Sequence, residues 1–126
     1  MRDKDLYEKG LEMGGKIYGK DGYKGLVERV QRYDDELADY LVENAFGQVL
    51  TREGLDLKTR MLCNVAALTA LGIETLLRSY INGALNVGAT EAEIREVLIQ
   101  MHLYAGWPRC LNAFSVFEQL LEDRGK

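Results

Sequence analysis

The apolar pattern in the second half of the chain predicts four helices separated by glycines. Thr90 stands three residues before Glu93, which is the spacing of a capping box, so a helix should begin at Thr90. Apolar positions then recur at three- and four-residue steps until Gly106 ends the helix. Pro108 suits the first turn of the next helix. The apolar stripe of that last helix contains Leu111, Phe114, Phe117, Leu120 and Leu121.

Earlier segments show the same periodicity with weaker boundaries. Gly72 and Gly88 should end helices over residues 57–71 and 75–87, which would form a hairpin. Residues 33–50 carry apolar side chains at helical spacing. In residues 1–30, Leu6, Leu11, Ile17 and Tyr18 could mark a helix, but four glycines interrupt it, each unfavourable inside a helix by roughly 1 kcal/mol relative to alanine. We therefore expect a frayed or partner-stabilised helical arm there. Those glycines are Gly10, Gly14, Gly15 and Gly19.

The whole pattern is typical of an all-α protein. No segment alternates with period two for long enough to suggest a sheet. The 126 residues, of which 47% are hydrophobic, suffice for one domain over 1–126, with about six to seven helices. The segment 57–71 is apolar around most of its circumference, so it must be surrounded, either as a central core helix or at a subunit interface.

Charge and cysteine content narrow the class of protein. The net charge of −4 leaves no basic stripe for a phosphate backbone, which argues against nucleic-acid binding. The first residues do not read as a signal peptide, and the longest apolar stretch, 61–73, is too short for a bilayer. The two cysteines form no C-x-x-C or metal-ligand pattern. We expect a cytoplasmic protein with free thiols and no membrane contact.

Four segments of the chain form a recognisable set. They are GLDLKTR at 54–60, NGALNVGATEAEIREVL at 82–98, YAGWP at 104–108 followed by Asn112 and Ala113, and ELADYLVENAFGQVLTREG at 36–54. Together they resemble the carboxymuconolactone decarboxylase family. The resemblance implies an alkylhydroperoxidase D-like helical bundle. It also implies an obligate homo-oligomer, a trimer or hexamer with active sites near subunit contacts, and a role in aromatic compound catabolism.

The peroxidase branch of this superfamily uses a glutamate, a C-x-x-C pair and a histidine. The matching positions here hold Met61, Ile73, Leu76 and Tyr80. A thiol needs a lowered pKa and a proton relay to reduce a peroxide, and Cys63 and Cys110 stand among aliphatic residues without either. Both cysteines are expected to pack in the core.

The decarboxylase branch lacks the cysteine pair but keeps the histidine that Tyr80 replaces. Releasing carbon dioxide leaves an enolate-like charge, to which Tyr80 could donate a hydrogen bond; the alternative is a core or rim tyrosine. His102 is the only histidine, and it is either an acid/base group or a residue packed at an interface edge. Gln100 and Tyr104 match the Gln-x-x-x-Tyr pattern of that branch and are pocket candidates.

A carboxylated substrate requires a cation, and arginine's planar fork suits a carboxylate. Arg60 matches the family's Thr-Arg pair, and Arg109 follows Pro108 in the first turn of a helix. For both, an ion pair is the alternative role. Trp107 either walls the pocket or anchors the last helix, with the anchor preferred. Arg95 is expected to be merely solvated.

The leading hypothesis is a lyase that decarboxylates a small carboxylated lactone or related acid. It would use no metal and no organic cofactor, and its partners would be the small molecule and further copies of itself. One alternative is a thiol-dependent peroxidase acting through Cys63 or Cys110. Another is a binding or assembly protein that kept the fold after losing its catalytic groups.

Overall fold

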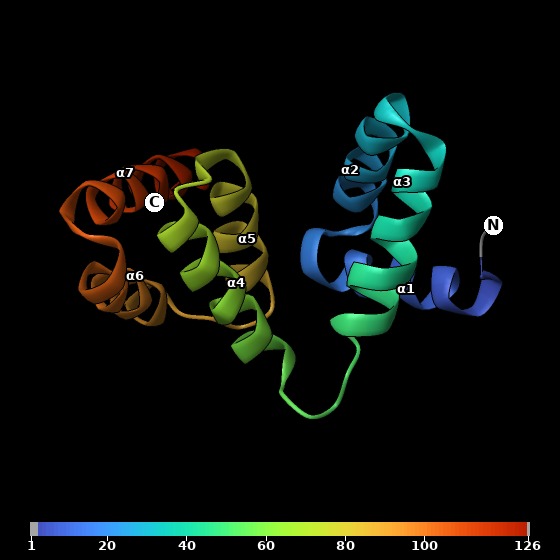
Figure 1. The fold of residues 1–126 in the computed structure, drawn as a ribbon, viewed down its shortest axis with the longest axis horizontal. Coiled ribbons are helices and arrows are strands. Elements are labelled where there is room, and N and C mark those ends of the chain that lie inside the picture. Colours follow the sequence, from blue (N-terminus) through green and yellow to red (C-terminus); the bar gives the residue numbers. More distant parts are fainter. Residues whose placement is uncertain (1–2, 126) are drawn as a thin grey trace. The chain divides into compact units, whose positions relative to one another are not determined.

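The computed structural model describes residues 3–125, in which all regular elements are helical, as expected. The chain divides into two compact units, Met1–Leu57 and Lys58–Lys126, and each contains four helical elements (Figure 1). No helix within residues 3–125 is long and apolar enough to cross a membrane.

The first unit begins with two complete helices, so the expected arm is helical but not frayed, and its stabilisation by a partner stays a prediction. Helix α1 spans Lys4–Tyr18 and α2 spans Lys20–Tyr33. The Asp3 side chain caps α1 by accepting the Leu6 N–H at 3.1 Å. Only Gly19 interrupts the helical path, with a φ of 79° between the two helices.

The other glycines of α1 serve close packing. A Cβ on Gly10 would overlap the backbone oxygen of Val42, and one on Gly14 would overlap the ring of Tyr23. At both positions a glycine lets α1 approach its neighbour more closely than any side chain would allow. The free energy gained from this close packing outweighs the cost of placing glycines inside a helix.

The predicted helix over residues 33–50 is divided into two elements. Asp34 is extended and caps α3 (Asp35–Tyr40), accepting the Leu37 N–H at 2.9 Å. From Leu41 to Val49 the chain forms a π-helix, η1, in which hydrogen bonds span five residues. The Leu50 N–H accordingly donates to the Ala45 carbonyl at 3.0 Å.

The π-helix keeps one row of apolar side chains in line. An α-helix advances by about 40° more than a full turn over four residues, so a strict four-residue row drifts around it. The wider π-helix turns less per residue and reverses that drift. The row therefore stays buried in the unit, where α1 packs against η1. Its members are Ala38, Val42, Phe46 and Leu50.

Phe46 and Glu43 connect this row to the helices around it. The Phe46 ring packs against Tyr23 with the ring centroids 4.7 Å apart. Glu43 is buried, and its carboxylate accepts the Asp3 N–H at the start of α1. A negative charge is favourable there because the amino end of a helix carries partial positive charge.

The second unit follows the sequence prediction closely. Its helices are α4 (Leu57–Leu71), α5 (Glu74–Asn86), α6 (Glu91–Ala105) and α7 (Trp107–Asp123). Each predicted glycine stop has a positive φ, of 75° at Gly72, 107° at Gly88 and 84° at Gly106. The core contains Met61, Val65, Thr69, Leu77, Ile81, Ala84, Ile94, Leu98, Cys110, Ala113, Phe117 and Leu120.

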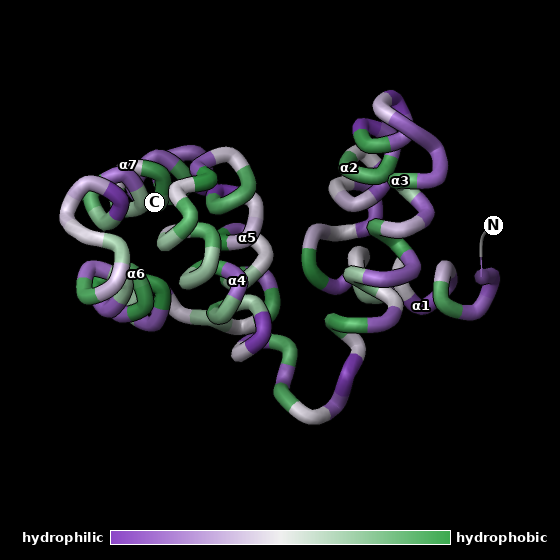
Figure 2. The backbone as a smooth tube through the Cα atoms, in the orientation of Figure 1, coloured by the Kyte–Doolittle hydropathy of each residue, from purple (hydrophilic) through white to green (hydrophobic). Residues whose placement is uncertain are grey.

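Helix α4 is not surrounded by the other helices of the second unit. Figure 2 shows its tube as hydrophobic over most of its length, with hydrophilic residues near the first turn. Yet only one stripe of it is buried, and Leu71 is 62% exposed. Two side chains from other helices contact its ends. Glu93 of α6 forms an ion pair with Lys58 at 3.1 Å, and Arg109 of α7 donates to the Ala70 carbonyl.

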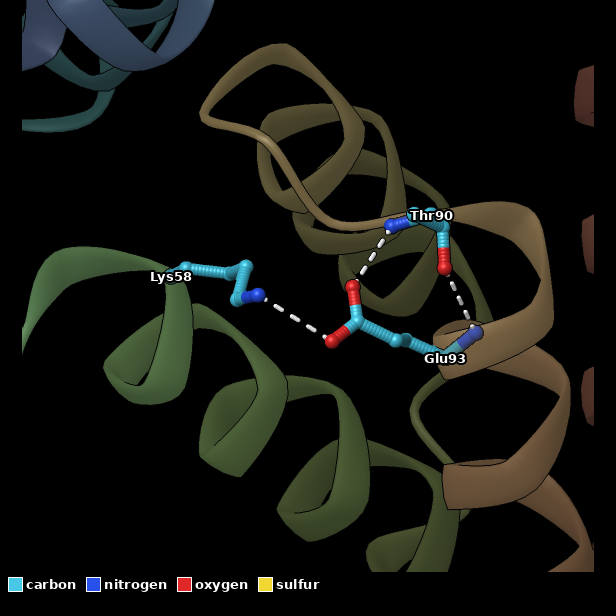
Figure 3. Close-up of polar contacts among 3 residues, drawn as sticks. All are labelled: Lys58, Thr90 and Glu93. Atoms are coloured by element: carbon cyan, nitrogen blue, oxygen red, sulfur yellow. Dashed lines mark hydrogen bonds and ion pairs between the residues drawn. The ribbon is translucent and has the colours of Figure 1, made fainter.

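The predicted capping box of α6 is confirmed and extended by Lys58 (Figure 3). The Thr90 hydroxyl accepts the Glu93 N–H at 3.0 Å, and the Glu93 carboxylate accepts the Thr90 N–H at 2.9 Å. The second carboxylate oxygen meets the Lys58 ammonium. The Thr90 N–H, and then the Lys58 side chain, lower the pKa of Glu93 from its usual 4.5.

This lowered pKa predicts a pH-dependent contribution to stability. The contribution should be complete above pH 4.5, the ordinary value, and be lost as the pH falls through the lower folded value. Replacing Glu93 by glutamine should therefore lower the melting temperature at pH 7 but make progressively less difference below pH 4.5. Glu96→Gln, an exposed change in the same helix, is the control. A Glu93→Gln effect that is independent of pH would contradict this account.

Candidate active site

The seven residues selected from the sequence all lie in the second unit. They are distributed over all four of its helices, and the structure brings some of them into contact and leaves others apart. Helix α4 carries Arg60, α5 carries Tyr80, α6 carries Gln100, His102 and Tyr104, and α7 carries Trp107 and Arg109.

His102 and Trp107 pack against each other across the α6–α7 turn. Their ring centroids are 4.4 Å apart, with the planes inclined by 37°. The Nδ1 atom of His102 is buried and has no hydrogen-bond partner among residues 3–125. A proton on Nδ1 would be a buried donor without an acceptor, so this environment favours the tautomer with its proton on Nε2. That tautomer presents Nε2–H as the hydrogen-bond donor.

Tyr80 is half-buried on α5, one residue before the fully buried Ile81. Burial raises the pKa of its phenol above the usual 10.0, because removal from water disfavours the charged phenolate. The hydroxyl therefore stays protonated at neutral pH. It can donate a hydrogen bond to a developing negative charge, but it is a poor base.

Gln100, Tyr104 and Trp107 lie on an open surface. Tyr104 is 79% exposed and Trp107 is 61% exposed, while Gln100 is also exposed. The Trp107 ring lies at the start of α7 and contacts His102 of α6, which is compatible with the preferred role as an anchor of the last helix; that role stays a prediction. These three side chains could form a pocket wall only when something else covers them.

The two candidate arginines differ in their surroundings. Arg60 is half-buried near the start of α4. Arg109 donates through Nη1 to the Ala70 carbonyl in the last turn of α4, and its guanidinium lies beside Gly72. Carbonyls at the end of a helix lack helical partners and attract cations, so this contact explains Arg109 as a cap of α4.

Sequence reasoning missed a groove between α5 and α7, which has a volume of about 400 Å³. Arg78 lines it and pairs with Asp123 through Nη2 and Oδ2 at 2.7 Å. These two residues are 45 positions apart, so no spacing within one helix could reveal the pair. The other lining residues are Glu74, Thr75, Asn112, Ser115, Val116 and Gln119.

The two cysteines occupy different environments. Cys110 is buried as expected, with its sulfur 3.5 Å from the Leu98 carbonyl oxygen. Cys63 is exposed on α4, so its predicted core position was wrong. Both thiols are free. Within residues 3–125, no three His, Cys, Asp or Glu side chains are grouped so that they could hold a metal ion.

Comparison with known proteins identifies the family of this chain. Residues 35–119 match the pattern of the carboxymuconolactone decarboxylase family. The chain belongs to this family.

Three relatives show how far the likeness extends. A 4-carboxymuconolactone decarboxylase from Acinetobacter baylyi is 31% identical over 125 residues, covering 99% of this chain and 93% of the relative. The nitrosuccinic acid decarboxylase npaB of Metarhizium robertsii is 27% identical, covering 94% and 82%. An uncharacterized 15.0 kDa protein of Paracoccus denitrificans is 38% identical, covering 66% and 63%.

Proposed function

We propose that this protein is a lyase that removes carbon dioxide from a small carboxylic acid without a cofactor. The observation that carries the proposal is the pair of decarboxylases, one bacterial and one fungal, that match the chain over nearly its full length. Their names share the reaction but not the substrate. The substrate proposed here is a carboxylated lactone or a related acid, as in aromatic compound catabolism, in which a neighbouring group can delocalise the charge.

The reaction breaks the bond between the substrate carbon and its carboxylate carbon. The electron pair of that bond stays on the substrate as an enolate-like anion, carbon dioxide leaves, and one proton is then added to the carbanion. The protein therefore has to bind a carboxylate, stabilise an oxyanion and let the carbanion take up a proton. Such preorganised electrostatic stabilisation is usually the largest contribution to catalysis.

The proposed roles follow from the side-chain environments. Tyr80, whose raised pKa keeps its phenol neutral, donates a hydrogen bond to the oxyanion. His102, through Nε2–H, and Gln100 donate further hydrogen bonds to the same anion, and the proton that the carbanion takes up comes from solvent water. Arg60 binds the substrate carboxylate. Tyr104 and Trp107 form the pocket wall, while Arg109 acts indirectly by holding the end of α4.

The test of this function is the release of carbon dioxide from 4-carboxymuconolactone, nitrosuccinic acid and related small acids. Turnover of at least one acid that survives in the Cys63→Ser/Cys110→Ser double variant would support the lyase. Peroxide consumption with a dithiol reductant that is lost in the same variant would support the peroxidase alternative. If neither reaction occurs, the non-catalytic binding protein is the better interpretation.

We further propose a cytoplasmic homo-oligomer, a trimer or hexamer, that covers the exposed corner between α6 and α7. We call this surface the corner patch. Leu103 within it is 76% exposed, and soluble monomers rarely expose a group of large apolar side chains. The patch comprises Ile99, Leu103, Tyr104, Trp107 and Leu111. Because Tyr104 and Trp107 belong to the patch, covering it would let these two side chains form a pocket wall.

Sedimentation velocity tests this assembly. The wild type should sediment as an oligomer at micromolar concentration, and Leu103→Lys should shift it toward the monomer because a charge cannot be buried there unpaired. Leu11→Lys changes an exposed leucine of α1, outside the patch, and is the control. A monomeric wild type would refute the assembly but leave the decarboxylase proposal standing.

A further inference from the structure

A second groove, separate from the residues proposed for decarboxylation, lies between α6 and α7. Its volume is about 420 Å³, within the range of small-molecule sites, which is roughly 300 to 1,000 Å³. We call it the α6–α7 groove. Its lining residues are Arg95 from α6 and Phe114, Ser115, Phe117, Glu118 and Leu121 from α7.

The groove combines an apolar base with two charges. Phe117 is buried, and Phe114 and Leu121 are half-buried, so together they offer an apolar surface. The guanidinium of Arg95 lies 5.8 Å from the centre of the Phe117 ring, within the range of a cation–π contact. Arg95 is exposed, as expected of a solvated side chain, and the contact with the Phe117 ring is an interaction that the sequence did not show.

The two charges come from opposite helices and remain unpaired. Arg95 belongs to α6 and Glu118 to α7, and both are exposed. Neither forms an ion pair with another residue in 3–125. The groove therefore offers one cation, one anion and an apolar surface to the same bound molecule. The Ser115 hydroxyl adds a hydrogen-bonding group.

The geometry points to a zwitterionic ligand, an α-amino acid with an apolar side chain, bound in the α6–α7 groove. Its carboxylate contacts the Arg95 guanidinium, which offers a planar set of donors. Its ammonium contacts the Glu118 carboxylate, and its side chain lies on Phe114 and Leu121. A purely anionic ligand would be repelled by Glu118, and a purely cationic ligand by Arg95.

Three probes of similar shape separate these contributions. Phenylalanine carries both charges, 3-phenylpropanoate only the carboxylate and 2-phenylethylamine only the ammonium. Each is titrated into the full chain at low salt and followed by calorimetry and by amide chemical shifts. Phenylalanine should bind about fivefold more tightly than either analogue, the effect of one partly exposed ion pair. Its shift changes should centre on residues 114–121 and Arg95.

Charge-removing variants then test the two contacts separately. Arg95→Gln should weaken the binding of phenylalanine by about fivefold and should not weaken the binding of 2-phenylethylamine. Glu118→Gln should also weaken the binding of phenylalanine by about fivefold, and it should not weaken the binding of 3-phenylpropanoate. Both side chains are exposed, so the fold should survive. The controls are Glu122→Gln, an exposed change of α7 outside the groove, and Arg29→Gln, an exposed change of α2.

Two outcomes would overturn the inference. One is an absence of phenylalanine binding at millimolar concentration, and the other is binding of a singly charged analogue as tight as that of phenylalanine. Both are independent of carbon dioxide release, so the groove and the decarboxylase proposal can fail separately.

Discussion

Replacing Tyr80 by phenylalanine should lower the rate of decarboxylation by about 10²-fold, the effect of removing one oxyanion donor. The ring stays in place and only the hydroxyl is lost, so substrate binding should change less than turnover. The fall should therefore appear in kcat, with KM nearly constant. Because burial raises the phenol pKa above 10.0, the contribution of the hydroxyl should persist throughout the neutral range. Steady-state kinetics between about pH 6 and pH 9 would measure it.

Two other variants make this result specific. Tyr33→Phe removes a hydroxyl from a tyrosine that is 74% exposed in the first unit, and it should leave the rate unchanged. Tyr80→His introduces the histidine that the resemblance to the decarboxylase branch implies at this position, and it should retain activity or increase it. A Tyr80→Phe variant as fast as the wild type would show that the oxyanion donor is another group, and His102 would be the next candidate.

Replacing Gly10 by alanine should destabilise the protein by about 3 kcal/mol, the upper part of the usual range for overpacking. The added methyl group would overlap the backbone oxygen of Val42, which has no side-chain freedom by which to move away. Helix α1 would have to separate from η1, and the buried contacts between them would be lost. Urea unfolding followed by circular dichroism measures the change.

Gly15→Ala is the matched control in the same helix. A Cβ at Gly15 meets nothing within 4 Å, so alanine there should stabilise the protein by about 0.5–1 kcal/mol through helix propensity alone. If Gly10→Ala lowers the free energy of unfolding and Gly15→Ala raises it, then packing, and not helix propensity, determines the effect of alanine at Gly10. Equal effects would refute the close approach of α1 to η1.

The second unit was predictable because its boundaries are encoded locally. Thr90 and Glu93 specify a helix start through their own hydrogen bonds, and Gly72, Gly88 and Gly106 provide the positive φ values that end helices. The predicted span 57–71 agrees with α4, and the predicted 75–87 differs from α5 by one residue at each end. Such signals do not depend on knowing the tertiary contacts.

The first unit was predicted poorly because its determinants are not local. Gly10 and Gly14 reduce helix propensity in the sequence, but their function depends on Val42 and Tyr23, which come later in the chain. Within residues 33–50, Asp34 caps the start of α3, and the helix type changes from α to π further on, at Leu41. A π-helix has no simple sequence pattern, because it differs from an α-helix only in its hydrogen-bond register.

The sequence supplies a set of candidate site residues, but it could not show how their side chains are arranged. From the sequence, Arg109 was expected either to bind a substrate carboxylate or to form an ion pair. In the structure its guanidinium donates a hydrogen bond to the Ala70 carbonyl. The His102–Trp107 contact crosses the α6–α7 turn, so periodicity within one helix could not show it. It stays a prediction that Arg60, Tyr80 and His102 act on one substrate.

The π-helix η1 also has an evolutionary consequence. Each turn of a π-helix contains about one residue more than a turn of an α-helix. A one-residue insertion can therefore be accommodated within η1, whereas in a regular α-helix it would rotate all later residues of the helix about its axis. Relatives that are one residue shorter between Asp34 and Thr51 should carry an ordinary α-helix there and still align over α4 to α7 without a compensating gap. This makes the segment a place where the chain length of the family can vary inside a buried helix, instead of in a surface loop.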